Sequence, residues 1–168
     1  MAIVTDDPRE ARGQAILDDL ARRAGVPRVA FLHMSAQRVA QAGLLDDRKT
    51  IAATTFLIDL LTDSELEATL AHELKHFVDG GVEDRAHEFE ADAYAVRITR
   101  HPEALISALN KISRFNSAKE SLRADATDDY HPSLHRRIGA IHGLARELGL
   151  EPRGWSRMRH AVAHAVEG

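Results

Sequence analysis

Apolar residues recur every three to four positions along much of the chain, which is the spacing of an amphipathic helix. Residues 8–24 show this pattern first, opened by Asp7-Pro8 and ended by Gly25 with Pro27. Similar patterns and boundary residues predict further helices over residues 63–78, 83–99, 102–115, 132–148 and 155–166.

Two short runs lack helical spacing and are rich in apolar or β-branched residues. Residues 29–32 and 50–55 are these runs, and each predicts a strand. Between them Gly43 and Asp46-Asp47 mark a turn before Lys49, and the apolar residues 56–61 predict a short helical turn after the second strand. Residues 116–130 are polar and predict a loop.

The composition favours packed helices over a large sheet, because aromatic residues make up only 5% of the chain and alanine is frequent. We therefore expect an α+β fold that is mainly helical. A chain of 168 residues corresponds to about one domain. We expect residues 1–168 to form it, with a core at about 28–148, an N-terminal helix at 8–24 and a C-terminal helix at 155–166.

Charge and composition narrow the classes of function. Hydrophobic residues make up 44% and charged residues 29%, as in soluble globular proteins, and the net charge of −4 argues against a nucleic-acid binder. The absence of cysteine excludes disulfides, thiolate metal sites and a cysteine nucleophile. Since neither a signal peptide nor an apolar run of about 20 residues is visible, we expect no membrane span and a cytoplasmic location.

The helix predicted over residues 63–78 contains the pattern His-Glu-x-x-His. His72 and His76 are four residues apart, so in a helix they lie one turn apart on the same face, where two imidazoles can bind one Zn²⁺. Glu73 lies beside them, placed to take a proton from a metal-bound water molecule. From the motif alone, a polar stripe on an ordinary helix is an equal alternative.

Two features predict this helix independently of the motif. Thr62 and Glu65 have the spacing of a capping box, in which each side chain bonds to the backbone of the other residue. Leucines recur beside the histidine face and form an apolar stripe. The stripe consists of Leu66, Leu70 and Leu74, followed by Phe77.

A catalytic zinc ion needs a third protein ligand, and the next helix offers candidates. Glu88 and Asp92 are four residues apart on one face, bordered by Ala91, whose small side chain allows a close helix approach. We assign Glu88 to the metal and Asp92 to the far nitrogen of a ligand histidine, which it would orient. Glu90 is the second choice as ligand, and a solvated acidic face is the alternative to any site.

Three segments together resemble a known peptidase family. They are His72-Glu73-Leu74-Lys75-His76, then Glu88-Phe89-Glu90-Ala91-Asp92, then His131-Pro132 with Arg137-Ile138. This combination, within about residues 28–142, resembles the gluzincin zinc metallopeptidases of the HtpX and CAAX prenyl protease type, the forty-eighth metallopeptidase family. The compact layout is similar to the soluble minigluzincins.

The resemblance implies a zincin-like fold, in which an edge strand of a small sheet precedes the zinc helix, which packs on a second ligand-bearing helix. It implies a zinc endopeptidase (a hydrolase) that acts on polypeptides. The residues implied are the metal ligands His72, His76 and Glu88, the catalytic Glu73, the supporting Asp92, and His131, which would steady an oxyanion.

The chain also departs from the family. Many members have membrane helices and a long insertion between the zinc helix and the third ligand, whereas residues 77–87 alone separate His76 from Glu88 here. Lys75 replaces a residue that is commonly small. We expect its side chain to be solvated, with a charge near the site that weakens metal binding or favours acidic substrates.

Several alternatives follow from the residues themselves. From the residues alone, His131 is as well explained as a helix cap before Pro132 as by an oxyanion role. Arg136 and Arg137 are interpreted as salt-bridging rather than substrate-binding residues. A peptide adding to an edge strand at residues 51–55 would explain substrate binding. The other histidines, interpreted as surface or interhelical residues, are His135, His160 and His164.

Two alternatives to a general endopeptidase concern function. The first is a catalytically weak or inactive metallopeptidase-like protein that acts through protein contacts. The second is a protease dedicated to one cytoplasmic regulator. Zinc content and hydrolysis of unfolded substrates would separate the first alternative from an active enzyme.

Overall fold

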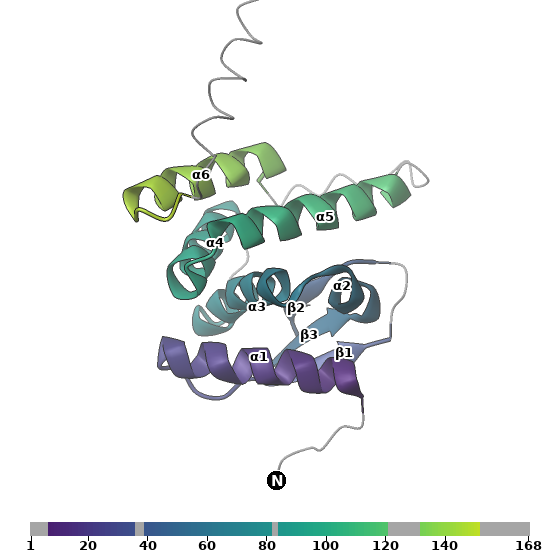
Figure 1. Cartoon of the computed structure of the whole chain (residues 1–168). Coiled ribbons are helices and arrows are strands. Elements are labelled where there is room, and N and C mark those ends of the chain that lie inside the picture. The colour runs from purple at the N-terminus through teal and green to yellow at the C-terminus, as the bar shows by residue number, and fades with distance from the viewer. Residues whose placement is uncertain (1–6, 36–38, 82–83, 121–131, 152–168) are drawn as a thin grey trace, which may run out of the picture.

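The computed structural model describes residues 7–35, 39–81, 84–120 and 132–151 (Figure 1). The described chain is mainly helical with one small sheet, as the composition predicted. Within these ranges, no helix combines the length and the apolar character that crossing a bilayer requires. The elements in chain order are α1 (Pro8–Ala24), β1 (Ala30–Met34), β2 (Ala42–Leu44), β3 (Thr50–Thr54), α2 (Thr55–Leu60), α3 (Asp63–Val78), α4 (Arg85–Thr99), α5 (Pro102–Glu120) and α6 (Leu134–Glu147).

The helix boundaries follow from local chemistry. The Asp7 side chain accepts a hydrogen bond from the backbone N–H of Arg9 at the start of α1, and Gly25 ends that helix with φ of 68°. The capping box of α3 is confirmed, because the Glu65 backbone donates to Thr62 and the Thr62 backbone donates to Glu65. These caps satisfy backbone groups that have no partner inside the helix.

Two expectations about loops are wrong. Gly43 lies within β2, because its extended backbone pairs with Ala52, and the predicted turn is present only at Asp46 and Asp47. The predicted loop at 116–130 begins as helix, since α5 continues to Glu120. Contacts with distant residues explain this, because the Asn116 side chain accepts from the Ala40 N–H and donates to its carbonyl. The C-terminal helix predicted at 155–166 lies outside the described residues.

The sheet has the order β1-β3-β2, with β1 parallel and β2 antiparallel to β3. The expectation that the strand before α3 is an edge is therefore wrong. β3 is hydrogen-bonded on both sides, and its residues Ile51–Thr54 are buried, which explains their continuous run of apolar and small side chains. A substrate peptide cannot add to β3, because its backbone donors and acceptors are already used.

Helix α3 runs through the middle of the molecule and positions the site. It contacts α1 and the sheet on one side and α4 and α5 on the other (Figure 1). Its leucines Leu66, Leu70 and Leu74 are fully buried, and burial of each contributes roughly 1.5–3 kcal/mol. The face beside these leucines, which contains the two histidines, is thereby turned toward α4.

Candidate metal centre

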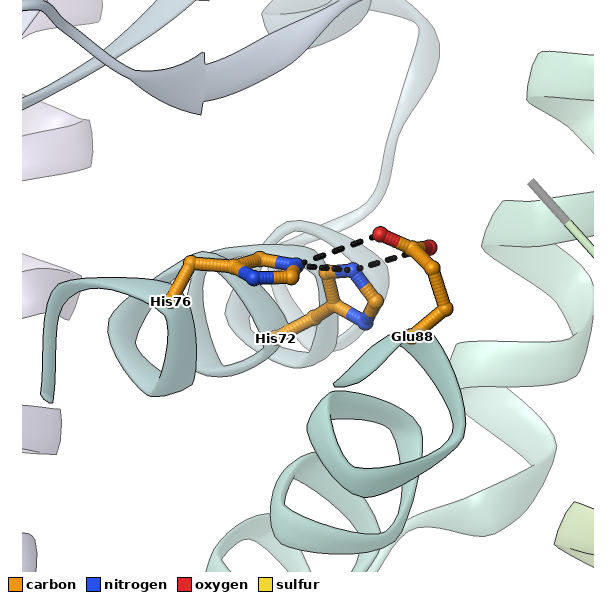
Figure 2. Close-up of side chains that lie close together, drawn as sticks. All are labelled: His72, His76 and Glu88. Atoms are coloured by element: carbon orange, nitrogen blue, oxygen red, sulfur yellow. Dashed lines mark hydrogen bonds and ion pairs between the residues drawn. The ribbon is translucent and has the colours of Figure 1, made fainter. Parts of the chain in front are cut away.

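The two histidines of the motif converge on one point. His72 and His76 lie on successive turns of α3 and are only 7% and 5% exposed. Their Nε2 atoms are 3.2 Å apart, as Figure 2 shows. The burial of two adjacent imidazoles against each other is costly for polar groups unless a further partner joins them.

The partner comes from α4. The Glu88 side chain, 5% exposed, points between the two rings from the neighbouring helix (Figure 2). Its Oε1 lies 3.3 Å from His76 Nε2, and its Oε2 lies 3.6 Å from His72 Nε2. The fully buried Ala91 and Ala95 line this face of α4, and their small side chains let the two helices approach closely. The helix pairing expected from the sequence is thus present in the fold.

The three side chains fit a zinc ion. A tetrahedron with metal–ligand bonds of about 2.0–2.1 Å has edges of about 3.4 Å, close to the separations of 3.2, 3.3 and 3.6 Å between the donor atoms. His72, His76 and Glu88 each offer a donor atom within 4.8 Å of the others. Two imidazoles and one carboxylate form the donor set typical of catalytic zinc sites.

Asp92 orients one of the imidazoles. Its Oδ1 lies 2.9 Å from Nδ1 of His72, so the Nδ1–H of the ring can donate to the carboxylate and leave Nε2 directed at the site. Burial alone would raise the pKa of Asp92, but hydrogen bonds from Arg137 and His72 hold this pKa below its usual value. Asp92 is thus a buried carboxylate kept ionised by its partners.

Arg137 of α6 is a site residue that sequence reasoning interpreted only as salt-bridging. The ion pairs are present: the guanidinium binds both oxygens of Asp92, at 2.7 and 2.6 Å, and its Nη1 lies 3.2 Å from Glu88 Oε2. Its side chain is 11% exposed. The sequence held two signals for this role. Arg137-Ile138 is one of the segments that resemble the peptidase family, and Arg137 lies four residues before Ile141, which is buried on the inner side of α6.

Glu73 lies next to the pair of histidines and is partly exposed. Burial raises the pKa of Glu73, and the nearby Glu88 charge raises it further, while His72, His76 and Arg137 oppose the shift. Its place beside the two histidines suits a carboxylate that accepts and then returns a proton.

Lys75 differs from the expectation of a solvated charge beside the site. Its ammonium group contacts both oxygens of Asp79, at 2.6 and 2.7 Å, and its side chain is only 21% exposed. The partner lies four residues further along α3, as in other helical ion pairs. The Lys75 charge is therefore neutralised locally, at the C-terminal end of the helix.

The remaining histidines add little to this centre. His135 is exposed on α6, in agreement with its interpretation as a surface residue. The predicted oxyanion residue His131 and the pair His160 and His164 lie outside the described residues. The expectation for His131 therefore stays a prediction.

Residues 7–84 match the model of Peptidase family M48. The chain is similar to this family over that segment, which is slightly less than half of its 168 residues. The match includes His72, Glu73 and His76 and ends before Glu88, so the third position of the site is supported by the geometry of α4 rather than by this match.

Similar proteins include several that carry the name Protease HtpX. A Protease HtpX homolog of Sulfurovum sp. is 28% identical in an alignment of 155 positions, which covers 60% of this chain and 56% of that protein. A Protease HtpX of Legionella pneumophila is 40% identical over 65 residues, and the alignment covers 38% of this chain and 23% of that protein. A Protease HtpX homolog of Ralstonia nicotianae is 26% identical in an alignment of 214 positions, which covers 91% of this chain and 73% of that protein.

The chain is shorter than these relatives. It spans 56% of the Sulfurovum protein and 23% of the Legionella protein. The Ralstonia alignment has 214 positions, more than the 168 residues of this chain, so that protein contains segments without a counterpart here. No solved structure is significantly similar to the chain.

Proposed function

We propose that this chain is a zinc-dependent peptidase that hydrolyses peptide bonds within polypeptides. The observation that carries the proposal is the buried convergence of His72, His76 and Glu88 from two packed helices. The match of residues 7–84 to Peptidase family M48 supports the same reaction class. In this proposal these three residues hold the ion, and Glu73 is the general base.

The charges around the site suit a divalent ion. The carboxylates of Glu73, Glu88 and Asp92, when all are ionised, exceed the guanidinium of Arg137 by two negative charges. One divalent cation would balance them. A buried group of like charges is otherwise costly, so the donor set itself favours occupancy by a cation.

Zinc bound in this site would polarise a scissile carbonyl and make a water molecule more acidic. The steps assigned to the chain are proton transfers. Glu73 accepts a proton from the attacking water and returns it to the nitrogen of the leaving amine, in the role of general base and then general acid.

The other residues position these groups. Asp92 keeps His72 Nδ1 protonated and Nε2 directed inward, and Arg137 holds Asp92 and one oxygen of Glu88. Glu88 then presents its other oxygen between the rings. The assignment of His131 to an oxyanion would complete the machinery and awaits a direct test.

Replacing Glu73 tests the proposal. The Glu73→Gln variant should retain zinc, because Glu73 is not a ligand, and should lose roughly 10²–10⁴-fold in hydrolysis of an unfolded casein-like protein. A matched control is Glu147→Gln, an exposed residue of α6, which should keep full activity. A zinc-loaded wild-type chain without hydrolysis would instead support an inactive, protein-binding relative, and full activity of the Glu73→Gln variant would contradict the assigned base.

A further inference from the structure

A second group of metal-ligating side chains lies at the junction of α3 and α4. Asp79 caps the C-terminal end of α3, and His87 and Glu90 lie in the first turns of α4. Each offers one ligand atom, and these atoms all lie within 4.8 Å of one another. None of the three belongs to the centre formed by His72, His76 and Glu88.

A neighbouring carboxylate holds the histidine of this group. Asp84 Oδ1 lies 2.9 Å from His87 Nδ1, although the ring N–H does not point straight at the oxygen. The same oxygen accepts from the backbone N–H groups of Ala86 and His87, which fixes its position at the start of α4. His72 and Asp92 show the same Nδ1-to-carboxylate separation of 2.9 Å. A carboxylate beside a ring nitrogen is common around metal-binding histidines, and the buried His87 Nδ1 makes no hydrogen bond to the described residues.

A cation already occupies one side of this group. The Lys75 ammonium contacts both oxygens of Asp79, at 2.6 and 2.7 Å, and the two side chains are 21% and 19% exposed. The Asp79 carboxylate is thus held where positive charge is stable. A divalent ion shared with His87 and Glu90 would compete with this ammonium for the same oxygens.

We propose that Asp79, His87 and Glu90 form a second site for a divalent transition-metal ion, with zinc as its probe. One imidazole and two carboxylates suit zinc and related transition ions, whereas Mg²⁺ and Ca²⁺ prefer oxygen ligands alone. The site is distinct from the proposed catalytic centre and does not depend on peptidase activity. Since Glu90 is exposed and Lys75 competes, it is the weaker of the two sites.

Occupancy of this site has a structural consequence. An ion there joins the end of α3 to the start of α4, the two helices whose packing brings His76 and Glu88 together. Binding to the folded state alone raises stability with metal concentration. The second zinc ion should therefore raise the melting temperature in addition to any effect of the first.

Zinc titration of the wild type and three single variants tests the proposal. The wild-type chain should bind a tight and then a weaker zinc ion, and His87→Ala should lose only the weaker one. The variant Lys75→Met should bind the weaker ion about fivefold more tightly, because the competing ion pair is gone. The exposed His101, 3.2 Å from Glu103, supplies the control, and His101→Ala should titrate like the wild type.

The double variant His72→Ala/His76→Ala separates the two sites. It should still bind one zinc ion, and adding His87→Ala should remove this binding. If the double variant does not fold, the melting temperature of the wild type and of His87→Ala at increasing zinc decides instead. A second zinc ion that binds His87→Ala as well as the wild type, or a wild-type chain that binds one ion only, would overturn the proposal.

Discussion

Arg137 donates two hydrogen bonds to the Asp92 carboxylate, from Nε to Oδ2 at 2.7 Å and from Nη2 to Oδ1 at 2.6 Å. This paired geometry is the strongest that arginine and a carboxylate form. The same guanidinium lies 3.2 Å from Glu88 Oε2. Helix α6 therefore holds both acidic residues of α4 that face the centre, although it provides none of the proposed metal ligands.

Removal of this guanidinium should weaken metal binding. In Arg137→Met the buried Asp92 loses the two hydrogen bonds from the guanidinium, so Asp92 is less firmly positioned to orient His72. Glu88 loses its ion pair with the same group. We expect zinc affinity to fall by roughly 10–100-fold, as for other groups that orient metal ligands. Competition with a chromophoric chelator measures this affinity.

The neighbouring Arg136 provides the matched control for Arg137. It is exposed on the same helix, so Arg136→Met should bind zinc like the wild type. Unchanged zinc affinity in Arg137→Met would show that α6 does not contribute to metal binding at the centre. Arg137→Lys should recover part of the loss, because one ammonium cannot reproduce both bonds.

The ion pair network at Glu65 should make stability depend on pH. Its Oε2 accepts from Lys111 at 2.7 Å and its Oε1 from Ser107 at 2.6 Å, which joins α3 to α5. Burial alone would raise the pKa of Glu65, but these bonds and those from Thr62 lower it from 4.5 to about 2. The stabilisation is fully present above the unfolded-state pKa and is lost as the pH falls through the folded-state value.

Urea unfolding of metal-free protein at neutral pH and near pH 3 measures this dependence. Glu65→Gln should reduce the free energy of unfolding by about 2 kcal/mol at neutral pH and by much less near pH 3. The exposed Glu147→Gln should match the wild type at both values. Equal losses for Glu65→Gln at the two pH values would mean that packing, rather than the carboxylate charge, accounts for the effect.

A close approach between α1 and β1 should make Gly13 intolerant of a side chain. A Cβ at Gly13 would overlap the ring of Phe31, which is 5% exposed and cannot move aside easily. We expect Gly13→Ala to lower the free energy of unfolding by about 1–3 kcal/mol, despite the helix propensity of alanine. Chemical denaturation measures the change.

Gly139 of α6 is the matched control for Gly13, because it is exposed and a Cβ there meets nothing within 4 Å. Gly139→Ala should therefore stabilise the chain by up to about 1 kcal/mol, through helix propensity alone. Opposite signs for the two substitutions would confirm that the overlap with Phe31 decides the outcome. The same sign for both would contradict it.

Local chemistry made much of the fold predictable. The start of α3 was predictable from Thr62 and Glu65 because a capping box acts within one helical turn. The end of α1 was predictable at Gly25, where φ is positive. The place of β3 in the middle of the sheet was not predictable, because strand order depends on residues far apart in the sequence.

In the candidate centre, too, the features set by local spacing were predictable and the contacts between distant residues were not. The spacing of His72 and His76, and of Glu88 and Asp92, already placed each pair on one helix face, and the structure brings these faces together. Arg137 enters from a separate helix, 45 residues beyond Asp92, and no local pattern reports such a contact. The pairing of Lys75 with Asp79 was open to prediction, because four residues is the spacing of a helical ion pair.

The most direct test of the centre is anomalous diffraction at the zinc absorption edge from crystals of the zinc-loaded chain. We predict a strong peak at about 2.0–2.2 Å from Nε2 of His72, Nε2 of His76 and one carboxylate oxygen of Glu88. A peak bound by the two histidines with Glu88 turned away, or no peak between α3 and α4, would contradict the proposed metal centre.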